Sequence, residues 1–142
     1  MPSHPKRLYA DTSFYYAALD SRDAHHGKAL EWVQYVQSEN LVLVSSWEII
    51  VETVTLLRTR YSYKAALGFI ERVLPDIEVV YIDDEIRSRA ITLFKKLSRD
   101  KSLSLCDVIS YILVTEHLEQ ISCLAFDDDF SRLGLAILSI RF

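Results

Sequence analysis

Hydrophobic positions along the chain follow two kinds of spacing. Short apolar runs predict buried strands over 7–10, 41–45, 78–82, 122–126 and 136–140. Between these runs, apolar residues recur every three or four positions and predict helices over 13–19, 25–37, 46–60, 63–73, 84–97 and 105–117. Strands that alternate with helices favour right-handed crossovers, so the pattern predicts a central parallel sheet covered on both faces, a three-layer α/β/α fold.

Local signals mark several helix ends. Ser46 is placed to cap the helix that follows the second strand, and Pro75 ends the fourth helix. Asp83 or Asp84 begins the helix after the third strand. In the helix that starts after Ser46, apolar residues at helical spacing predict a stripe that faces the core. This stripe consists of Trp47, Ile50, Val51, Val54 and Leu57.

Size and composition narrow the class of protein. The 142 residues, of which 50% are hydrophobic and 25% charged, suit one folded domain over 1–142 rather than a disordered chain. With three glycines, the chain contains neither a Walker loop nor a GxGxxG turn, which argues against most NTPases and dinucleotide enzymes. The net charge of −4 argues against binding nucleic acid through bulk positive charge alone.

The sequence also predicts where the protein resides. Its longest apolar runs fall far short of a membrane span, and residues 1–7 lack the apolar region of a secretion signal. Cys106 and Cys123 do not have the spacing of a metal site, and two thiols suit a reducing cytosol better than a disulfide scaffold. We therefore expect a cytoplasmic protein without a membrane partner.

Carboxylates follow the predicted strands. Asp11 comes after the first strand, Asp127 after the fourth, and Glu52 lies within the helix after the second. Asp107, near the start of an apolar helix, is expected at the same edge, where ligands bind in open parallel sheets. Taken singly, Asp11 could cap a helix, and Asp107 could form a capping box with Ser104.

Taken together, these acids predict a metal site. Carboxylates brought close to one another resist ionising together unless a cation neutralises them. Oxygen donors without cysteine or histidine at metal spacing favour Mg²⁺ or Mn²⁺ over Zn²⁺. Such an ion on a parallel sheet suits phosphoryl transfer, and phosphodiester hydrolysis is the natural reaction.

Four segments in this order resemble the acidic motifs of PIN-domain ribonucleases, and most closely those of VapC-type toxins. They are residues 9–13 (YADTS), 46–58 (SWEIIVETVTLLR), 103–107 (LSLCD) and 125–130 (AFDDDF). The resemblance covers nearly the whole chain. It implies a PIN-like fold and places the family's catalytic, metal-binding acids on Asp11, Glu52, Asp107 and Asp127. Asp129 would be an auxiliary acid, and Ser13 matches the small polar position beside the metal.

The same resemblance implies a chemistry and a set of partners. It implies one or two Mg²⁺ or Mn²⁺ ions, in-line attack of an activated water on phosphorus, and products with a 5′-phosphate and a 3′-hydroxyl. RNA is the implied substrate. A homodimer is also implied, as is an antitoxin protein that occludes the acidic groove if the chain is a toxin.

Some assignments remain open at this level. Glu48 rivals Glu52 because the two lie four residues apart on one helical face. The run Asp127 to Asp129 leaves the fourth acid ambiguous, although Asp127 is the first polar residue after the strand and Asp128 is expected to point to solvent. His25 and His26 are interpreted as exposed residues of a first helical turn rather than general bases.

Basic residues must flank an acidic groove that binds RNA. Two groups are candidates for phosphate contacts, although cations also favour helix ends. The first group is Arg58, Arg60 and Lys64, and the second is Lys95, Lys96, Arg99 and Lys101.

Three other interpretations compete with a ribonuclease toxin. One is a PIN nuclease that processes RNA outside a toxin–antitoxin pair. Another is a receiver-like signalling domain that binds Mg²⁺ without catalysing hydrolysis, for which Asp83 and Asp84 superficially fit. The third is an inactive PIN-like module that only binds a partner, although the full set of acids argues against it.

Overall fold

The computed structural model describes residues 6–99 and 101–137, and a parallel sheet organises them. Its strands are β1 (Arg7–Ala10), β2 (Val42–Ser46), β3 (Glu78–Val80) and β4 (Cys123–Leu124). They lie in the order β3-β2-β1-β4, and every pairing is parallel. The chain therefore runs from β1 to one side for β2 and β3 and to the other side for β4. In open parallel sheets, ligands bind at the carboxyl ends of the strands where the order reverses in this way, here between β1 and β4.

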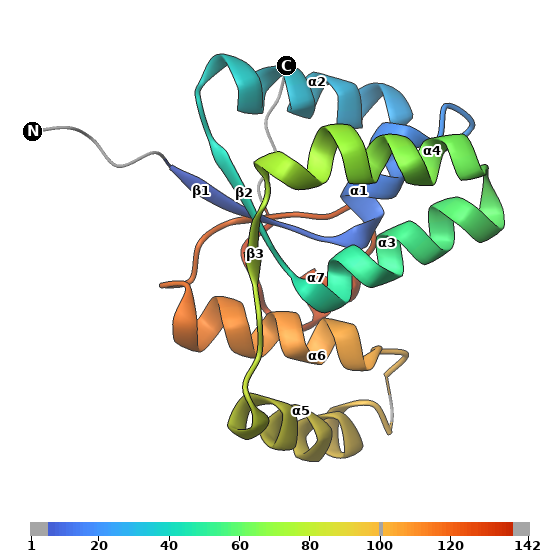
Figure 1. Cartoon of the computed structure of the whole chain (residues 1–142). Coiled ribbons are helices and arrows are strands. Elements are labelled where there is room, and N and C mark those ends of the chain that lie inside the picture. Colours follow the sequence, from blue (N-terminus) through green and yellow to red (C-terminus); the bar gives the residue numbers. More distant parts are fainter. Residues whose placement is uncertain (1–5, 100, 138–142) are drawn as a thin grey trace, which may run out of the picture.

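Helices cover both faces of the sheet. The α-helices are α1 (Thr12–Leu19), α2 (His26–Ser38), α3 (Trp47–Arg60), α4 (Tyr63–Gly68), α5 (Asp84–Leu97), α6 (Leu105–Ile112) and α7 (Asp129–Arg132). Helices α1 to α4 lie on one side of the sheet, and α5 and α6 pack together on the other (Figure 1). The predicted three-layer α/β/α fold is confirmed.

Two helices predicted as continuous change their winding near the end. Helix α4 continues as the π-helix η1 (Phe69–Val73) and the short 3₁₀-helix η2 (Leu74–Asp76), which contains Pro75. Helix α6 continues as the π-helix η3 (Leu113–His117). Both predicted lengths are correct, because a wider turn keeps the apolar residues on the core side while the local winding changes.

The predicted caps are present. Ser46 accepts a hydrogen bond from Ile49 N at 3.2 Å and begins α3, and Asp83 accepts one from Ile86 N at 2.8 Å and begins α5. Each cap satisfies a backbone donor that the first turn of a helix leaves unpaired. These ends depend on local sequence alone, which is why they could be predicted.

The predicted core stripe of α3 is wrong in part. Ile50 and Leu57 are buried, whereas Trp47 and Val51 are 44% and 46% exposed. Ile49, which lies outside the predicted stripe, is fully buried instead. In the first turn of α3 the core-facing side is therefore that of Ile49 and Ile50, and the indole of Trp47 stacks on the exposed Tyr81 with 6.2 Å between ring centroids.

The strand predicted over 136–140 lies mostly outside the described residues. Of its described part, Ile137 forms an isolated parallel bridge with Cys123 of β4. The described part therefore extends the sheet beyond β4 by one residue pair.

Candidate active site

An acidic cleft opens where the carboxyl ends of β1 and β4 meet. Its volume is about 450 Å³. Every acid assigned to the site from the sequence lines it, together with one further aspartate: Asp11, Asp23, Glu52, Asp107, Asp127 and Asp129. These residues come from five separate segments of the chain, so only the fold brings them together.

Asp11 is the most buried of these acids. It caps the N-terminus of α1, and its Oδ2 accepts hydrogen bonds from Ser13 N at 3.3 Å and Ser13 Oγ at 2.9 Å. The backbone NH of Asp11 donates to Leu124 O at 3.0 Å, which places it directly beside β4. Burial, and then the negative charge of Asp127, raise the pKa of Asp11 to about 8.

Ser13 joins the two strand ends. Besides donating to Asp11, its hydroxyl oxygen accepts a hydrogen bond from Phe126 N at 3.0 Å. The serine thereby holds the segment after β4 against the start of α1. This contact explains why a small hydroxyl residue suits the position two residues after Asp11.

Asp107 occupies the first turn of α6 and is both a cap and a member of the cleft. Its Oδ2 accepts from Ser104 N at 2.9 Å, and Ser104 Oγ accepts from Asp107 N at 3.0 Å, which is the predicted capping box. Burial raises the pKa of Asp107 to about 6. One turn further along α6, Ser110 Oγ shares a 2.7 Å hydrogen bond with Tyr9 Oη, which fixes α6 against β1.

Glu52 enters the cleft from the middle of α3. Its Oε2 accepts a hydrogen bond from Thr12 Oγ1 at 2.9 Å, and Thr53 Oγ1 donates to Thr12 Oγ1 at 3.3 Å. The carboxylate is therefore held beside Asp11. The rival Glu48 does not line the cleft, and among the described residues its buried Oε2 has no hydrogen-bond partner.

The three consecutive aspartates take different positions. Asp127 and Asp129 line the cleft and Asp128 does not, although Asp127 and Asp128 are both exposed. Asp129 N donates to Asp127 Oδ1 at 3.3 Å. Partial desolvation, and then the charge of Asp129, raise the pKa of Asp127. The geometry thus agrees with the expectation that Asp128 points to solvent.

The donor set suits a hard divalent cation. All the acids in the cleft offer oxygen atoms. Burial, and then the charges of Asp127 and Asp107, raise the pKa of Asp11, and a bound cation would favour its charged form. Among the described residues, however, no three acidic, histidine or cysteine side chains are close enough together to hold an ion as they stand. The residues fit the chemistry of Mg²⁺ or Mn²⁺, and a bound ion requires the carboxylates to move closer to one another.

The predicted basic residues divide into three sets. Arg60 lines the cleft. Arg99 and Lys101 lie in a shallow hollow that shares Ser102 with the cleft. The remaining candidates lie outside the cleft lining: Arg58, Lys64, Lys95 and Lys96.

The sequence did not single out several residues of the cleft wall. Thr12, Tyr16 and Phe126 line it, as do Asp23 and His25 from the loop between α1 and α2. Thr12 and Phe126 each adjoin a predicted acid in sequence, which was the available signal. His25 was interpreted as an exposed helix-start residue, and it is exposed, but it also stands at this cleft.

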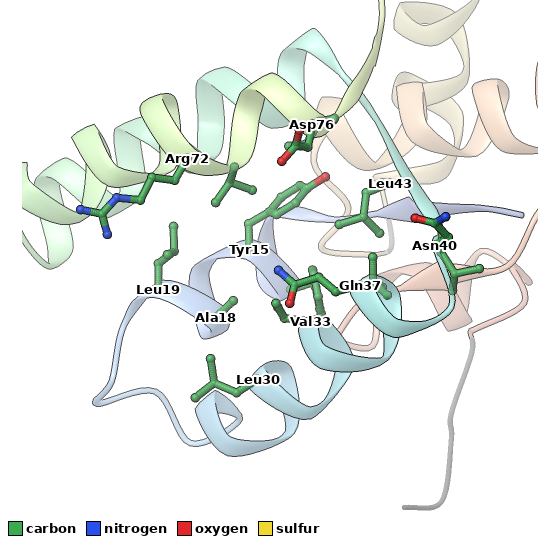
Figure 2. Close-up of a pocket in the computed structure, with 15 residues that line it drawn as sticks. Tyr15, Ala18, Leu19, Leu30, Val33, Gln37, Asn40, Leu43, Arg72 and Asp76 are labelled. Atoms are coloured by element: carbon green, nitrogen blue, oxygen red, sulfur yellow. The ribbon is translucent and has the colours of Figure 1, made fainter. Parts of the chain in front are cut away.

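A second cavity lies away from the acids, between α1, α2 and the segment that follows α4. Its volume is about 540 Å³, and most of its lining is apolar (Figure 2). Leu19, Leu30 and Val33 lie around it, with Arg72 and Asp76 as its charged residues. Its described lining holds one acid and one arginine, whereas the carboxylates gather in the acidic cleft.

Comparison with known proteins agrees with this geometry. The model of the PIN domain matches residues 8–135. A VapC ribonuclease of Archaeoglobus fulgidus is 29% identical over 124 residues, covering 85% of this chain and 77% of that protein. The 23S rRNA-specific endonuclease VapC20 of Mycobacterium tuberculosis is 28% identical over 129 residues, covering 89% of this chain and 94% of that protein.

A solved structure is also similar. The crystal structure of M. tuberculosis VapC20, described as a sarcin–ricin loop cleaving toxin, superposes with a TM-score of 0.73 at 26% identity. The match covers 92% of this chain and 98% of that one. Separately, within the described part of the chain, no helix has the length and apolar character needed to cross a membrane.

Proposed function

The chain belongs to the PIN-domain family, and we propose that it is a metal-dependent endoribonuclease whose active site is the acidic cleft. Asp11, Glu52, Asp107 and Asp127 are the catalytic, metal-binding acids, with Asp129 and Ser13 in supporting positions. One observation carries this assignment: the fold brings carboxylates from separate segments into one cleft and leaves Asp11 without a countercharge. The match of the family model to residues 8–135 supports a single PIN-like domain.

The residues of the cleft have separate roles in the proposed reaction. Asp11, Asp107 and Asp127 would hold Mg²⁺ or Mn²⁺, with Glu52 completing the negative site. When bound, the ion acidifies water and stabilises negative charge on the phosphate. Ser13 keeps the Asp11 carboxylate oriented, and Thr12 does the same for Glu52. In-line attack of water on phosphorus would then leave a 5′-phosphate and a 3′-hydroxyl.

We propose structured RNA as the substrate, with the ribosomal sarcin–ricin loop as the first RNA to test. Support comes from the relative that is named as specific for 23S rRNA and spans nearly the whole of this chain. Arg60 in the cleft wall would contact phosphates, as would Arg99 and Lys101 in the hollow that adjoins the cleft at Ser102. Such a protein would act in the cytoplasm, where this substrate is found.

We propose two protein partners. The first is a cognate antitoxin that occludes the acidic cleft, which would make the chain the toxin of a toxin–antitoxin pair. The second is another copy of the chain. The exposed group of Trp47, Val51 and Tyr81 supports a homodimer. These apolar side chains are 44%, 46% and 70% exposed, and burying them in an interface would remove apolar surface from water.

A cleavage assay with matched variants tests the proposed function. The purified chain is incubated with a sarcin–ricin hairpin, a tRNA pool and an unstructured oligoribonucleotide, in Mg²⁺, Mn²⁺ or chelator. We expect cleavage of at least one RNA that requires the metal and is lost in Asp107→Asn. Asp127→Asn should reduce the rate at least tenfold more than Asp128→Asn, its matched control one residue along.

Each contrary outcome has a distinct meaning. Cleavage that survives chelator, or equal activity of wild type and Asp107→Asn, would refute the site. Absence of cleavage of all three RNAs in both metals would favour a module that only binds a partner. A nuclease that no co-encoded small protein inhibits would be an RNA-processing enzyme rather than a toxin.

A further inference from the structure

Two aromatic rings lie face to face at the wall of the acidic cleft. The imidazole of His25 and the ring of Phe126 have centroids 4.8 Å apart and planes inclined by 2°. Phe126 in turn stacks on Phe14, with centroids 6.2 Å apart and an angle of 24°. Phe14 is buried and His25 is exposed, so three nearly parallel rings run from the core to solvent.

This column of rings ends beside the acids. Phe126 directly precedes Asp127, and its backbone NH donates to Ser13 Oγ, the same hydroxyl that donates to Asp11. His25 and Phe126 both line the cleft. The Ser13 hydroxyl that holds Asp11 therefore also holds the backbone of Phe126, on which the exposed ring of His25 stacks.

The conformation of His25 is not explained by helix capping. His25 precedes α2, but its side chain makes no capping hydrogen bond. The neighbouring His26 performs the structural task, since its Nδ1 is 2.7 Å from Ala17 O and ties the start of α2 to α1. The imidazole of His25 is thus available to a ligand in the cleft.

Binding of an RNA chain in this cleft requires a contact that does not depend on charge. The lining contains six carboxylates and one guanidinium, that of Arg60, so the wall repels phosphates apart from those at a bound cation and at Arg60. An aromatic face attracts a nucleobase whatever the charge nearby, because stacking depends on the two π-faces.

We propose that His25, supported by Phe126, is the stacking platform for the nucleobase of a nucleotide that flanks the scissile phosphate. The proposal rests on the proposed nuclease activity and adds a positioning residue to it. The base lies on the free face of the imidazole, and the rigid column behind the imidazole keeps that face in place. Stacking tolerates any base, so this contact positions the chain without specifying its sequence.

Substitutions at position 25 separate the ring from its polar atoms. His25→Gln keeps a polar side chain without a ring, His25→Phe keeps a ring without the nitrogens, and His25→Ala removes both. We expect His25→Ala and His25→Gln to raise KM for RNA about fivefold or more, and His25→Phe to stay within about twofold of wild type. All three should keep kcat and the metal requirement within about twofold, because none of them removes a carboxylate.

A fluorescent base reports stacking directly. The probe is whichever RNA of the cleavage panel the wild type cuts fastest, with 2-aminopurine placed in turn on each side of the cleaved bond. Binding is measured with Asp107→Asn protein, which prevents turnover. We expect quenching of 2-aminopurine at one of the two positions, its loss in D107N/H25Q, and its retention in D107N/H25F.

The outcomes distinguish this proposal from the nuclease assignment. If wild type cleaves and the KM values of all three variants match it, the platform is wrong while the nuclease stands. If His25→Phe fails as badly as His25→Ala, a hydrogen bond or charge of the imidazole is responsible, which also overturns stacking. If wild type cleaves no RNA, the nuclease assignment itself has failed. Thermal unfolding of the variants should match that of wild type, because His25 is exposed.

Discussion

The two ends of α1 carry aspartates that are equally buried and electrostatically opposite. Asp11 precedes the helix and Asp20 follows it, and each is 3% exposed. Asp20 accepts two hydrogen bonds of 3.0 Å from the Arg22 guanidinium and one of 2.7 Å from Tyr16 Oη. These contacts hold the pKa of Asp20 well below its usual range, whereas the pKa of Asp11 rises to about 8.

The difference shows which contacts stabilise a buried carboxylate in its charged form. Burying a carboxylate is costly unless an opposite charge and hydrogen-bond donors accompany it. At Asp20 the fold supplies both, and Arg22 also donates to Arg60 O at 2.8 Å, which ties the loop after α1 to the end of α3. At Asp11 the fold supplies hydrogen bonds from Ser13 and places other acids nearby, so the carboxyl favours its protonated form unless a cation supplies the opposite charge.

The largest expected effect is on the rate of RNA cleavage when Asp11, a proposed metal ligand, is replaced. Asp11→Asn should lower the rate of RNA cleavage by roughly 10³-fold, because it removes a charged ligand of the cation. Asparagine caps a helix as well as aspartate does, so α1 should persist. The matched control is Asp20→Asn, which should retain cleavage within about tenfold. Similar activity of the two variants in a single-turnover assay would contradict the distinction.

The free energy of unfolding should show the opposite order, with a loss in Asp20→Asn and none in Asp11→Asn. Asp20→Asn should lower the free energy of unfolding by about 1–3 kcal/mol, because an amide cannot accept every hydrogen bond that the buried carboxylate accepts. Arg22→Ala should lower it as well, because it leaves the Asp20 carboxylate without its opposite charge. Asp11→Asn, measured without divalent cation at neutral pH, should leave the protein as stable as wild type or more so, because it relieves repulsion. Urea unfolding of the three variants measures these values. A loss of stability in Asp11→Asn equal to that in Asp20→Asn would show that both acids are structural.

The free energy of unfolding should depend on pH in opposite ways at Asp11 and Asp20, because the pKa of Asp11 is raised and that of Asp20 is lowered. Unfolded aspartate titrates near pH 4. Asp11 at about 8 and Asp107 at about 6 bind more protons in the folded state, so stability without metal should fall as pH rises from about 4 to 8. Asp20 contributes stability above its unfolded pKa that is lost as pH falls below about 4.

Chelator-treated wild type, unfolded in urea across this pH range, tests the signs. The expected fall between pH 4 and 8 is on the order of 1–3 kcal/mol, less than the shifts alone imply because unbound acids relax and hydrate. Asp11→Asn should flatten the profile over this range. Stability that instead rises steadily from pH 4 to 8 would mean that the acids are already compensated.

The smallest expected effect concerns added metal. Because Mg²⁺ or Mn²⁺ would bind the folded acids, millimolar concentrations should raise the melting temperature of wild type by a few degrees, and more at pH 8 than at pH 5. Asp20→Asn should show the same increment from its lower baseline, while Asp11→Asn and Asp107→Asn should lose it. Absence of any increment in wild type would count against a cation site in the cleft.

Much of the architecture could be predicted because it depends on short-range patterns. Ser46 and Asp83 begin helices at the predicted places, and Ser104 with Asp107 forms the predicted capping box. Apolar periodicity located the strands and the helices between them, but it did not predict the short helix α7. The stripe containing Trp47 and Val51 was a second exception, since periodicity identifies an apolar face but not which of its residues another element covers.

The assignment of the acids depended partly on the sequence and partly on the fold. Their positions after strands predicted a shared edge, and the resemblance named the members. The position of Asp127 directly after a strand already favoured it over Asp128, and the fold agrees, since Asp127 lines the cleft and Asp128 does not. The local pattern left Glu48 and Glu52 on one helical face, and the fold distinguishes them, because Glu52 reaches Thr12 and the cleft and Glu48 does not.

The sequence by itself determined the order of strands and helices, the caps of α3, α5 and α6, and the set of acids from which the site is drawn. These follow from backbone periodicity and from hydrogen bonds that span three or four residues. Only the tertiary structure decided that Asp11 faces Asp127 and that His25 stacks on Phe126 beside them. The physical reason is that the charge of a buried carboxylate depends on the groups packed around it, and the fold chooses those groups.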